Sequence, residues 1–103
     1  SNLATGDVKG LANKVWNLDL LNEKYREIIE KIEAKHLTVT HDRVKMLNDS
    51  DRENLVKMVI ELREGYLGAV LRDPFLPKEL LPIDWKGEKA RALIRELRRF
   101  EIE

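Results

Sequence analysis

The chain contains no cysteine, which excludes disulfide bridges and thiolate metal sites and is compatible with a reducing cytoplasm. It also has no excess of either charge, because 19 basic side chains balance 19 acidic ones. A dedicated nucleic-acid module or a polybasic membrane surface usually has a marked basic excess, so both are disfavoured. No apolar run approaches the ~20 residues that span a bilayer. We therefore expect a cytoplasmic protein without membrane contact.

What the chain does have is a high content of both apolar and charged residues. Over 103 residues, 43% are hydrophobic and 37% are charged, a balance that suits one domain, residues 1–103, with one modest core. The chain starts with Ser1-Asn2 and no initiator methionine, so we expect these two residues to be a cloning remnant. The rest is then expected to be part of a longer protein.

Helical spacing dominates the apolar pattern, and no alternating strand pattern is evident. The prediction is an all-α fold, a small bundle of four or five helices with a proline-rich crossing segment before the last one. The first helix is expected to begin near Gly6-Asp7, with Asp7 as its N-cap. Its apolar stripe is Val8, Leu11, Ala12 and Val15. The pattern breaks over residues 16–19, which predicts a bend.

Two further helices follow. The second runs to about His36 and its buried face is Leu21, Tyr25, Ile28, Ile29 and Ile32. Residues 37–49 fit no clear pattern and are expected to be mainly loop. The third opens with Ser50 and Glu53 at capping-box spacing, and its stripe is Leu55, Val59, Leu62, Tyr66 and Val70. Gly65 and Gly68 share a flank of this helix. They indicate either close approach of another helix or a helix weakened near its end.

All three prolines lie between Asp73 and Ile83, a segment that we call the strap. Pro74 should end the third helix, because a proline disfavours the helical conformation of the residue before it. Pro77 is expected at the first position of a single helical turn. The expected apolar anchors of the strap are Phe75, Leu76, Leu80 and Leu81. Asp84 is then expected to cap the last helix, whose stripe is Ala90, Leu93, Ile94, Leu97 and Phe100.

Catalytic and metal-binding patterns are missing from the sequence. His36 and His41 are five positions apart and have no HExxH-like frame around them. The acidic pairs lie in charged faces or helix starts, without apolar surroundings to raise a carboxyl pKa. There is no glycine-rich phosphate loop and no nucleophile elbow. We therefore expect no enzyme, no metal site and no cofactor.

The last helix has a basic face. Its cations are Lys86, Lys89, Arg91, Arg95, Arg98 and Arg99. Such a face is either solvated or a site for phosphate or an acidic partner, since the arginine fork suits phosphate oxygens. Trp85 can be a structural anchor or a stacking surface for a ligand. Trp16 can belong to the core or contact a domain outside this chain.

One long stretch resembles the C-terminal signature of PaaX-type transcriptional repressors. The matching positions are Asp73, Pro74, Leu76, Pro77, Glu79, Leu80, Leu81, Pro82, Asp84, Trp85, Gly87, Ala90 and Arg91. The stretch from Trp16 to Tyr25 is similar to an earlier helix of that family, with its Trp-x-Leu-x-x-Leu-x-x-x-Tyr rhythm. Residues 37–60 match poorly. Residues 64–68 depart from the aromatic- and arginine-containing segment that usually precedes Asp-Pro in the family.

The resemblance implies a repressor of phenylacetate-type catabolism whose inducer is phenylacetyl-coenzyme A. Family members combine an N-terminal winged-helix DNA reader, a central dimerising domain and this helical part. The chain would then be the C-terminal regulatory domain of a homodimeric protein and would reach DNA only through the missing N-terminal domain. The candidates for effector or interdomain contacts are Arg72, Trp85, Lys86, Arg91 and Arg95. Two alternatives are a structural domain that binds no small ligand and an independent DNA-binding bundle.

Overall fold

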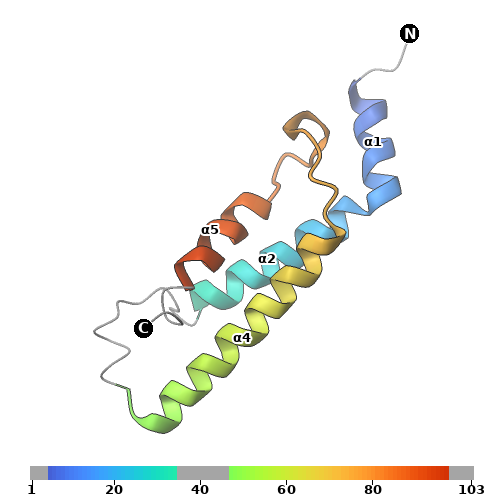
Figure 1. The fold of residues 1–103 in the computed structure, drawn as a ribbon. Coiled ribbons are helices and arrows are strands. Elements are labelled where there is room, and N and C mark those ends of the chain that lie inside the picture. Colours follow the sequence, from blue (N-terminus) through green and yellow to red (C-terminus); the bar gives the residue numbers. More distant parts are fainter. Residues whose placement is uncertain (1–4, 35–46, 98–103) are drawn as a thin grey trace.

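The computed structural model describes residues 5–34 and 47–97, and within these ranges it contains helices and no strand. The elements are α1 (Thr5–Trp16), α2 (Leu18–Ala34), α4 (Asp49–Arg72), the single 3₁₀ turn η1 (Lys78–Leu80) and α5 (Gly87–Leu97) (Figure 1). The predicted all-α bundle with a crossing segment before the last helix is confirmed. Residues 35–46 and 98–103 lie outside the description, and with them His36, His41, Arg98, Arg99 and Phe100.

Helix α2 lies at the centre of the core and packs on both α4 and α5. Its predicted apolar face is confirmed, because all five of its residues are at most 7% exposed. One half of the core joins Ile28 and Ile32 to Val59 and Leu62 of α4 and to Ile94 and Leu97 of α5. The other half joins Leu21, Tyr25 and Ile29 to Ala69 and Ala90. Each fully buried aliphatic side chain stabilises the fold by roughly 1.5–3 kcal/mol.

A sharp bend separates α1 from α2 at Asn17, whose backbone is left-handed with φ of 50°. Asparagine tolerates this conformation better than most residues. The side chain of Asn13 closes the bend, since its Nδ2 donates to Asp19 Oδ2 at 2.8 Å and its Oδ1 accepts the Asp19 amide at 2.9 Å. The predicted bend is confirmed. Helix α1 therefore leaves the bundle at an angle and contacts η1 of the strap (Figure 1).

The apolar stripe predicted for α1 is only partly buried, so that prediction is partly wrong. Ala12 is buried, but Leu11 and Val15 are 60% and 62% exposed. Trp16 is 45% exposed, so it does not belong to the core. Among the described elements, the main contacts of α1 are with η1 of the strap and with α2, and these leave Leu11 and Val15 uncovered. The helix also begins at Thr5, so Asp7 lies inside it and is not its N-cap.

Helix α4 begins earlier than its capping-box pattern predicts. Its N-cap is Asn48, whose Oδ1 accepts the Asp51 amide at 2.7 Å, while Ser50 lies inside the helix. Asparagine is as good an N-cap residue as serine, so the helix can begin earlier, at Asp49, and still have a capped N-terminus. Glu53 instead forms an ion pair with Lys57 at 3.7 Å. At the other end Asp73 is extended, which confirms that Pro74 stops the helix.

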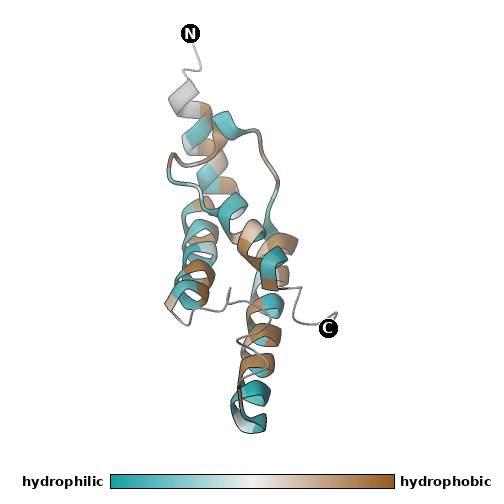
Figure 2. Ribbon diagram, turned by 90° about the vertical axis from the view of Figure 1, so that its left-hand side faces the viewer, coloured by the Kyte–Doolittle hydropathy of each residue, from teal (hydrophilic) through white to brown (hydrophobic). Residues whose placement is uncertain are grey.

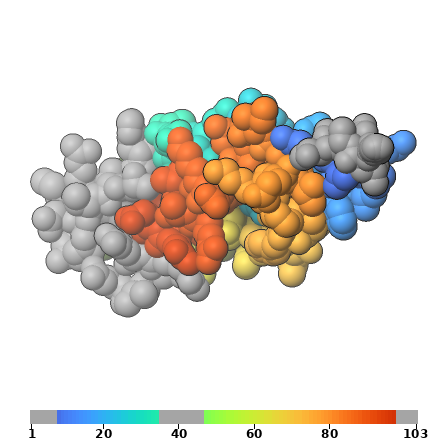
Figure 3. All heavy atoms as spheres, turned by 90° about the horizontal axis from the view of Figure 1, so that it is seen from above, coloured from blue at the N-terminus to red at the C-terminus, as the bar shows by residue number. Residues whose placement is uncertain are grey.

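Polar bonds, more than apolar anchors, hold the strap. Leu76, Leu80 and Leu81 are half-buried, but Phe75 is 69% exposed and is not the anchor that the sequence predicts. The predicted turn after Pro77 is present as η1. Asp84 does not cap α5, because that helix begins at Gly87 and its first bond runs from the Ala90 amide to the Lys86 carbonyl. Figure 3 shows the strap lying beside α5 on one face of the molecule, with α1 at the end.

The two glycines of α4 need no close neighbour. A Cβ atom added at Gly65 or Gly68 would meet nothing within 4 Å, so no helix approaches that flank among the described residues. Of the two interpretations, the weakened helix is the one that the structure supports. Glycine loses more backbone entropy on folding than alanine does, without any gain in packing here.

We expect Gly65→Ala and Gly68→Ala each to raise the free energy of unfolding by up to about 1 kcal/mol, because both positions are helical and open. Urea unfolding followed by circular dichroism measures this. A loss of stability at either position would contradict the open flank.

Candidate functional site

Tyr25 is the side chain around which the candidate site is built. It is 2% exposed, and its hydroxyl donates a hydrogen bond of 2.7 Å to Asp73 Oδ2. Its ring meets Tyr66 of α4 at a centroid distance of 6.0 Å and Trp85 edge-on at 5.6 Å. Edge-to-face contacts of this kind add to the stabilisation from burial. Tyr25 thus joins α2 to α4, to Asp73 at the start of the strap and to Trp85 just after its end.

The environment of Tyr25 favours its protonated form. Burial raises the pKa of the hydroxyl well above its usual range, and the hydrogen bond to the Asp73 carboxylate and the charge of that carboxylate raise it further. Tyr25 therefore remains a hydrogen-bond donor throughout the physiological pH range.

Asp73 fixes the start of the strap. While its Oδ2 accepts from Tyr25, its Oδ1 accepts the Phe75 amide at 2.8 Å. Phe75 has a left-handed backbone, with φ of 52°, which is unfavourable for a bulky side chain. The bond from the Phe75 amide to the Asp73 carboxylate stabilises this backbone conformation.

Asn22 fixes the short connection between the strap and α5. Its side chain is almost fully buried, and Oδ1 accepts the Lys86 amide at 2.7 Å. Its Nδ2 lies 3.3 Å from the Asp84 carbonyl and 3.4 Å from Asp84 Oδ1. A residue of α2 thereby satisfies a backbone amide just before α5, where the sequence predicts a cap from Asp84 itself.

Gly87 lets α5 start close to the aromatic rings. A Cβ atom at this position would lie 2.6 Å from Trp85 Nε1 and 3.3 Å from Tyr25 Cε2. The first of these distances is too short for any real carbon, so another side chain at position 87 would push the indole away. The absence of a side chain at Gly87 thus allows the edge-on contact of Trp85 with Tyr25.

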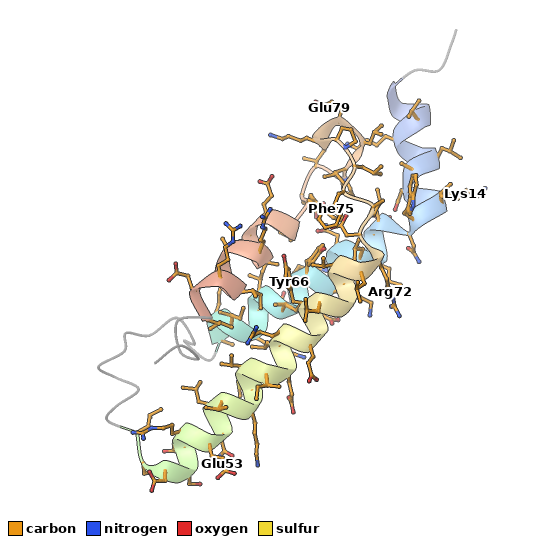
Figure 4. All side chains as sticks on the ribbon, viewed as in Figure 1. Lys14, Glu53, Tyr66, Arg72, Phe75 and Glu79 are labelled. Atoms are coloured by element: carbon orange, nitrogen blue, oxygen red, sulfur yellow. The ribbon has the colours of Figure 1, made fainter. Side chains whose placement is uncertain are left out.

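These contacts surround a hollow that we call the aromatic pocket. It has a volume of about 180 Å³ and lies between α2, α4, the strap and α5. Its aromatic lining is Tyr25, Tyr66, Phe75 and Trp85, and its other lining residues are Asp73, Leu76, Leu81, Gly87, Glu88 and Arg91. In Figure 4, Tyr66 extends from α4 into the space beside α5, and Phe75 lies on the strap above it.

A second hollow, the arginine groove, adjoins the aromatic pocket. It has a volume of about 260 Å³ and is lined by Arg63, Tyr66, Leu67, Arg91, Ile94 and Arg95. Tyr66 and Arg91 line both hollows, so the two are neighbours that share these side chains as a common wall. Arg91 and Arg95 are exposed, and neither forms an ion pair with a described residue. An anion in the groove would meet several guanidinium groups, which bind phosphate oxygens in pairs.

The structure brings together three of the five residues singled out in the sequence. Trp85 and Arg91 line the aromatic pocket, and Arg91 and Arg95 line the arginine groove. Arg72 and Lys86 line neither. Arg72 ends α4 and points away from α5 (Figure 4), so these two remain predicted interdomain contacts.

Sequence reasoning missed Arg63 and assigned Tyr25 and Tyr66 to the core alone. Arg63 carries no local signal, because only the approach of α5 to α4 brings it near Arg91 and Arg95. Within the described ranges, no group of three or more histidine, aspartate or glutamate side chains could hold a metal ion. None of the described helices has the length and hydropathy that a bilayer crossing requires.

We expect Tyr25→Phe to lower the free energy of unfolding by about 1–2 kcal/mol at neutral pH, because it removes a hydrogen bond to a carboxylate and keeps the ring. The raised pKa of Tyr25 also predicts how this difference changes with pH. The unfolded chain releases the Tyr25 proton near pH ~10, whereas the folded chain keeps it. The stabilisation is therefore complete below this pH and is lost as the pH rises above it.

Urea unfolding of both proteins at neutral and alkaline pH measures this effect, which should make the two stabilities converge above pH ~10. Tyr66→Phe is the matched control, since the Tyr66 hydroxyl bonds to no described residue and its loss should change little. Equal effects of the two substitutions would contradict the role of the Tyr25 hydroxyl.

We expect Gly87→Ala to lower the free energy of unfolding by about 1–3 kcal/mol, because the new methyl group overlaps the indole of Trp85. The displaced indole should also change the tryptophan fluorescence of the folded protein. Gly68→Ala is the control for the same chemical change at an open position. If Gly87→Ala leaves both the stability and the emission spectrum unchanged, the close contact at this position does not exist.

The family assignment follows from comparison with known proteins. The family model described as PaaX-like protein C-terminal domain matches residues 16–101. No curated protein and no solved structure matches the chain. The matched range contains α2, α4, the strap and α5, and hence every residue of the aromatic pocket and the arginine groove. The match covers far more than half of the 103 residues, and the chain therefore belongs to the PaaX-like C-terminal domain family.

Proposed function

We propose that this chain is the effector-response domain of a PaaX-family transcriptional repressor of aromatic-acid catabolism, and that it binds an aromatic acyl-coenzyme A. The observation that carries the proposal is that the aromatic pocket and the arginine groove lie next to each other and share Tyr66 and Arg91 as lining residues. An aromatic thioester of coenzyme A has the same two parts, an apolar ring at one end and phosphates at the other.

The size and lining of the aromatic pocket suit a phenyl group. An apolar cavity of roughly 150 Å³ is large enough to hold benzene, and this pocket measures about 180 Å³. Trp85, Tyr66 and Phe75 offer ring faces and edges to such a group. Trp85 can act as a structural anchor and as a ligand surface at once, because it contacts Tyr25 edge-on and is still only half-buried.

The arginine groove suits the phosphates of the same ligand. Arg91 lies at the junction of the two hollows, and Arg95 lies one helical turn further along α5. Guanidinium groups bind phosphate oxygens in a bidentate manner, and each such charge-assisted bond contributes about 1.5–3 kcal/mol. The net charge of the chain is zero, so the attraction of an anion depends on this local cluster of arginines and not on an overall positive charge.

The regulatory mechanism that we propose is a population shift. The effector would prefer the conformer of the full-length protein that cannot hold DNA, and it would stabilise that conformer by its difference in affinity for the two states. In this proposal the chain works inside a homodimeric cytoplasmic protein, catalyses no reaction, and meets DNA only through a separate winged-helix domain. Arg72 and Lys86 would then serve as contacts between domains.

Calorimetric titration of this chain with phenylacetyl-coenzyme A, coenzyme A and phenylacetate tests the proposal. We expect the thioester to bind more tightly than either part alone, because only the thioester fills both hollows. Arg91→Ala should weaken thioester binding about tenfold or more, which is the loss of one charge-assisted bond. Arg72→Ala is the matched control, an exposed arginine that lines neither hollow, and it should leave binding unchanged.

Other outcomes separate the alternatives. Binding by the longer protein but not by this chain would place the site between domains. No binding by either would make the structural role, without a small ligand, the better description of the chain. An equal loss in Arg72→Ala and Arg91→Ala would mean that the anion responds only to overall charge.

A further inference from the structure

The two hollows between α4 and α5 have charges of opposite sign at their outer ends. The helices are antiparallel here, because the lining residues of α4 rise in number from the arginine groove to the aromatic pocket, while those of α5 fall. Arg63 and Arg95 therefore lie at one end, and Asp73 and Glu88 lie at the other. Asp73 is about 15 Å along α4 from Arg63. A ligand that spans both hollows has one end among cations and the other beside carboxylates.

The Asp73 carboxylate is fixed in place but can accept a further hydrogen bond. Its Oδ2 accepts from the Tyr25 hydroxyl and its Oδ1 from the Phe75 amide. Two carboxylate oxygens have about four acceptor positions, so about half of them remain. Asp73 is half-buried, and no described cation forms an ion pair with it. A donor group of a ligand would meet a charged acceptor that needs no reorientation.

Glu88 gives the same end of the aromatic pocket a second negative charge. It is exposed in the first turn of α5, and none of the described cations forms an ion pair with it. Two carboxylates repel an anionic substituent of a ligand but not a neutral donor. A phenolic hydroxyl has a pKa of ~10, so it is a neutral donor at physiological pH. This end of the pocket therefore favours a hydroxyl group over a carboxylate on the ring.

The volume of the aromatic pocket leaves room for one polar atom in addition to a phenyl ring. A cavity of roughly 150 Å³ holds benzene, and a water molecule takes up about 30 Å³. The aromatic pocket measures about 180 Å³. It can therefore hold a benzene ring together with one hydroxyl group.

We propose that the effector of this site has a hydroxyl group on its aromatic ring, opposite the acyl chain, and that this hydroxyl donates to the Asp73 carboxylate. The inference rests on the proposed function, which puts the phosphates among the arginines and hence the far side of the ring toward Asp73. The class of effector is then a coenzyme A thioester of a para-hydroxylated arylacetic acid. Asp73 both fixes the start of the strap and binds the ligand.

Calorimetric titration of this chain with three coenzyme A thioesters tests the inference. The para-hydroxyphenylacetyl thioester should bind about tenfold more tightly than the phenylacetyl thioester, which is the gain from one hydrogen bond to a charged group. The ortho-hydroxyphenylacetyl thioester is the matched control. It has the same atoms, but its hydroxyl lies beside the acyl chain and away from Asp73, so it should bind no more tightly than the phenylacetyl thioester.

Asp73→Asn tests the acceptor itself. Asparagine keeps the shape and one oxygen but loses the charge, so the preference for the para-hydroxyl should fall to about threefold or less. Glu79→Gln is the matched control, because Glu79 is an exposed carboxylate of the strap that lines neither hollow, and this variant should keep the full preference. Circular dichroism shows whether Asp73→Asn keeps the fold. The comparison of the three thioesters on the unchanged chain does not depend on that variant.

Other results would overturn the inference. Equal affinities for the para-hydroxyphenylacetyl and phenylacetyl thioesters would do so and would leave the proposed function in place. An equal gain for the ortho isomer would also do so, because the added affinity would not come from the end of the pocket at Asp73. A folded Asp73→Asn that keeps the full preference would exclude Asp73 as the acceptor. If none of the three thioesters binds, the inference and the proposed function fail together.

Discussion

The position of the strap depends on one hydrogen bond between segments that are 48 residues apart, from the Tyr25 hydroxyl to the Asp73 carboxylate. Tyr25 is rigidly held, because α2 is buried between α4 and α5 and the ring is itself almost fully buried. Asp73 is the first residue after α4, so fixing its carboxylate fixes the direction in which the chain leaves that helix. The aromatic pocket exists because the strap is held at this point while Asn22 holds the connection between the strap and α5.

The start of the strap and the residues just after its end are thus attached to α2 by polar side chains, while its middle contacts α1 at η1. Such an arrangement differs from a loop held by large apolar anchors. Phe75, the largest apolar side chain of the strap, is mostly exposed and borders the aromatic pocket instead of filling the core. Hydrogen bonds to a carboxylate and a buried amide depend strongly on geometry. They therefore fix where the strap lies without covering the hollow beneath it.

The sequence predicted the helices of the bundle and the buried faces of α2, α4 and α5, because their apolar spacing is regular and each face meets another helix. It also predicted the bend before α2 and the end of α4, which depend on local backbone preferences. Some wrong predictions are local, since the N-caps of α1 and α4 were misplaced by a few residues. The others concern partners that lie far away in the sequence. Asp84 was predicted to cap α5, but Asn22 of α2 makes the contact with the Lys86 amide. Leu11 and Val15 were predicted to be buried, but no described element covers them. Figure 2 shows apolar and polar residues interspersed along the helices, so hydropathy alone does not distinguish the covered faces from the uncovered ones.

The candidate site was predictable only in part for the same reason. Arg91, Arg95 and Trp85 were noticed because they follow one another in the sequence near α5. Arg63 and Tyr66 come from α4, and their contribution depends on the angle at which α5 crosses that helix. Tyr25 was correctly assigned to the core, but its hydroxyl had no predicted partner, since nothing local links it to Asp73.

The contact between α1 and η1 has a mechanical consequence. Helix α1 touches the middle of the strap at η1 and is joined to α2 through the stiff bend at Asn17. A movement of the strap away from α5 must either change the tilt of α1 or break the contact between α1 and η1. The position of the strap and the tilt of α1 relative to α2 are therefore not independent of each other.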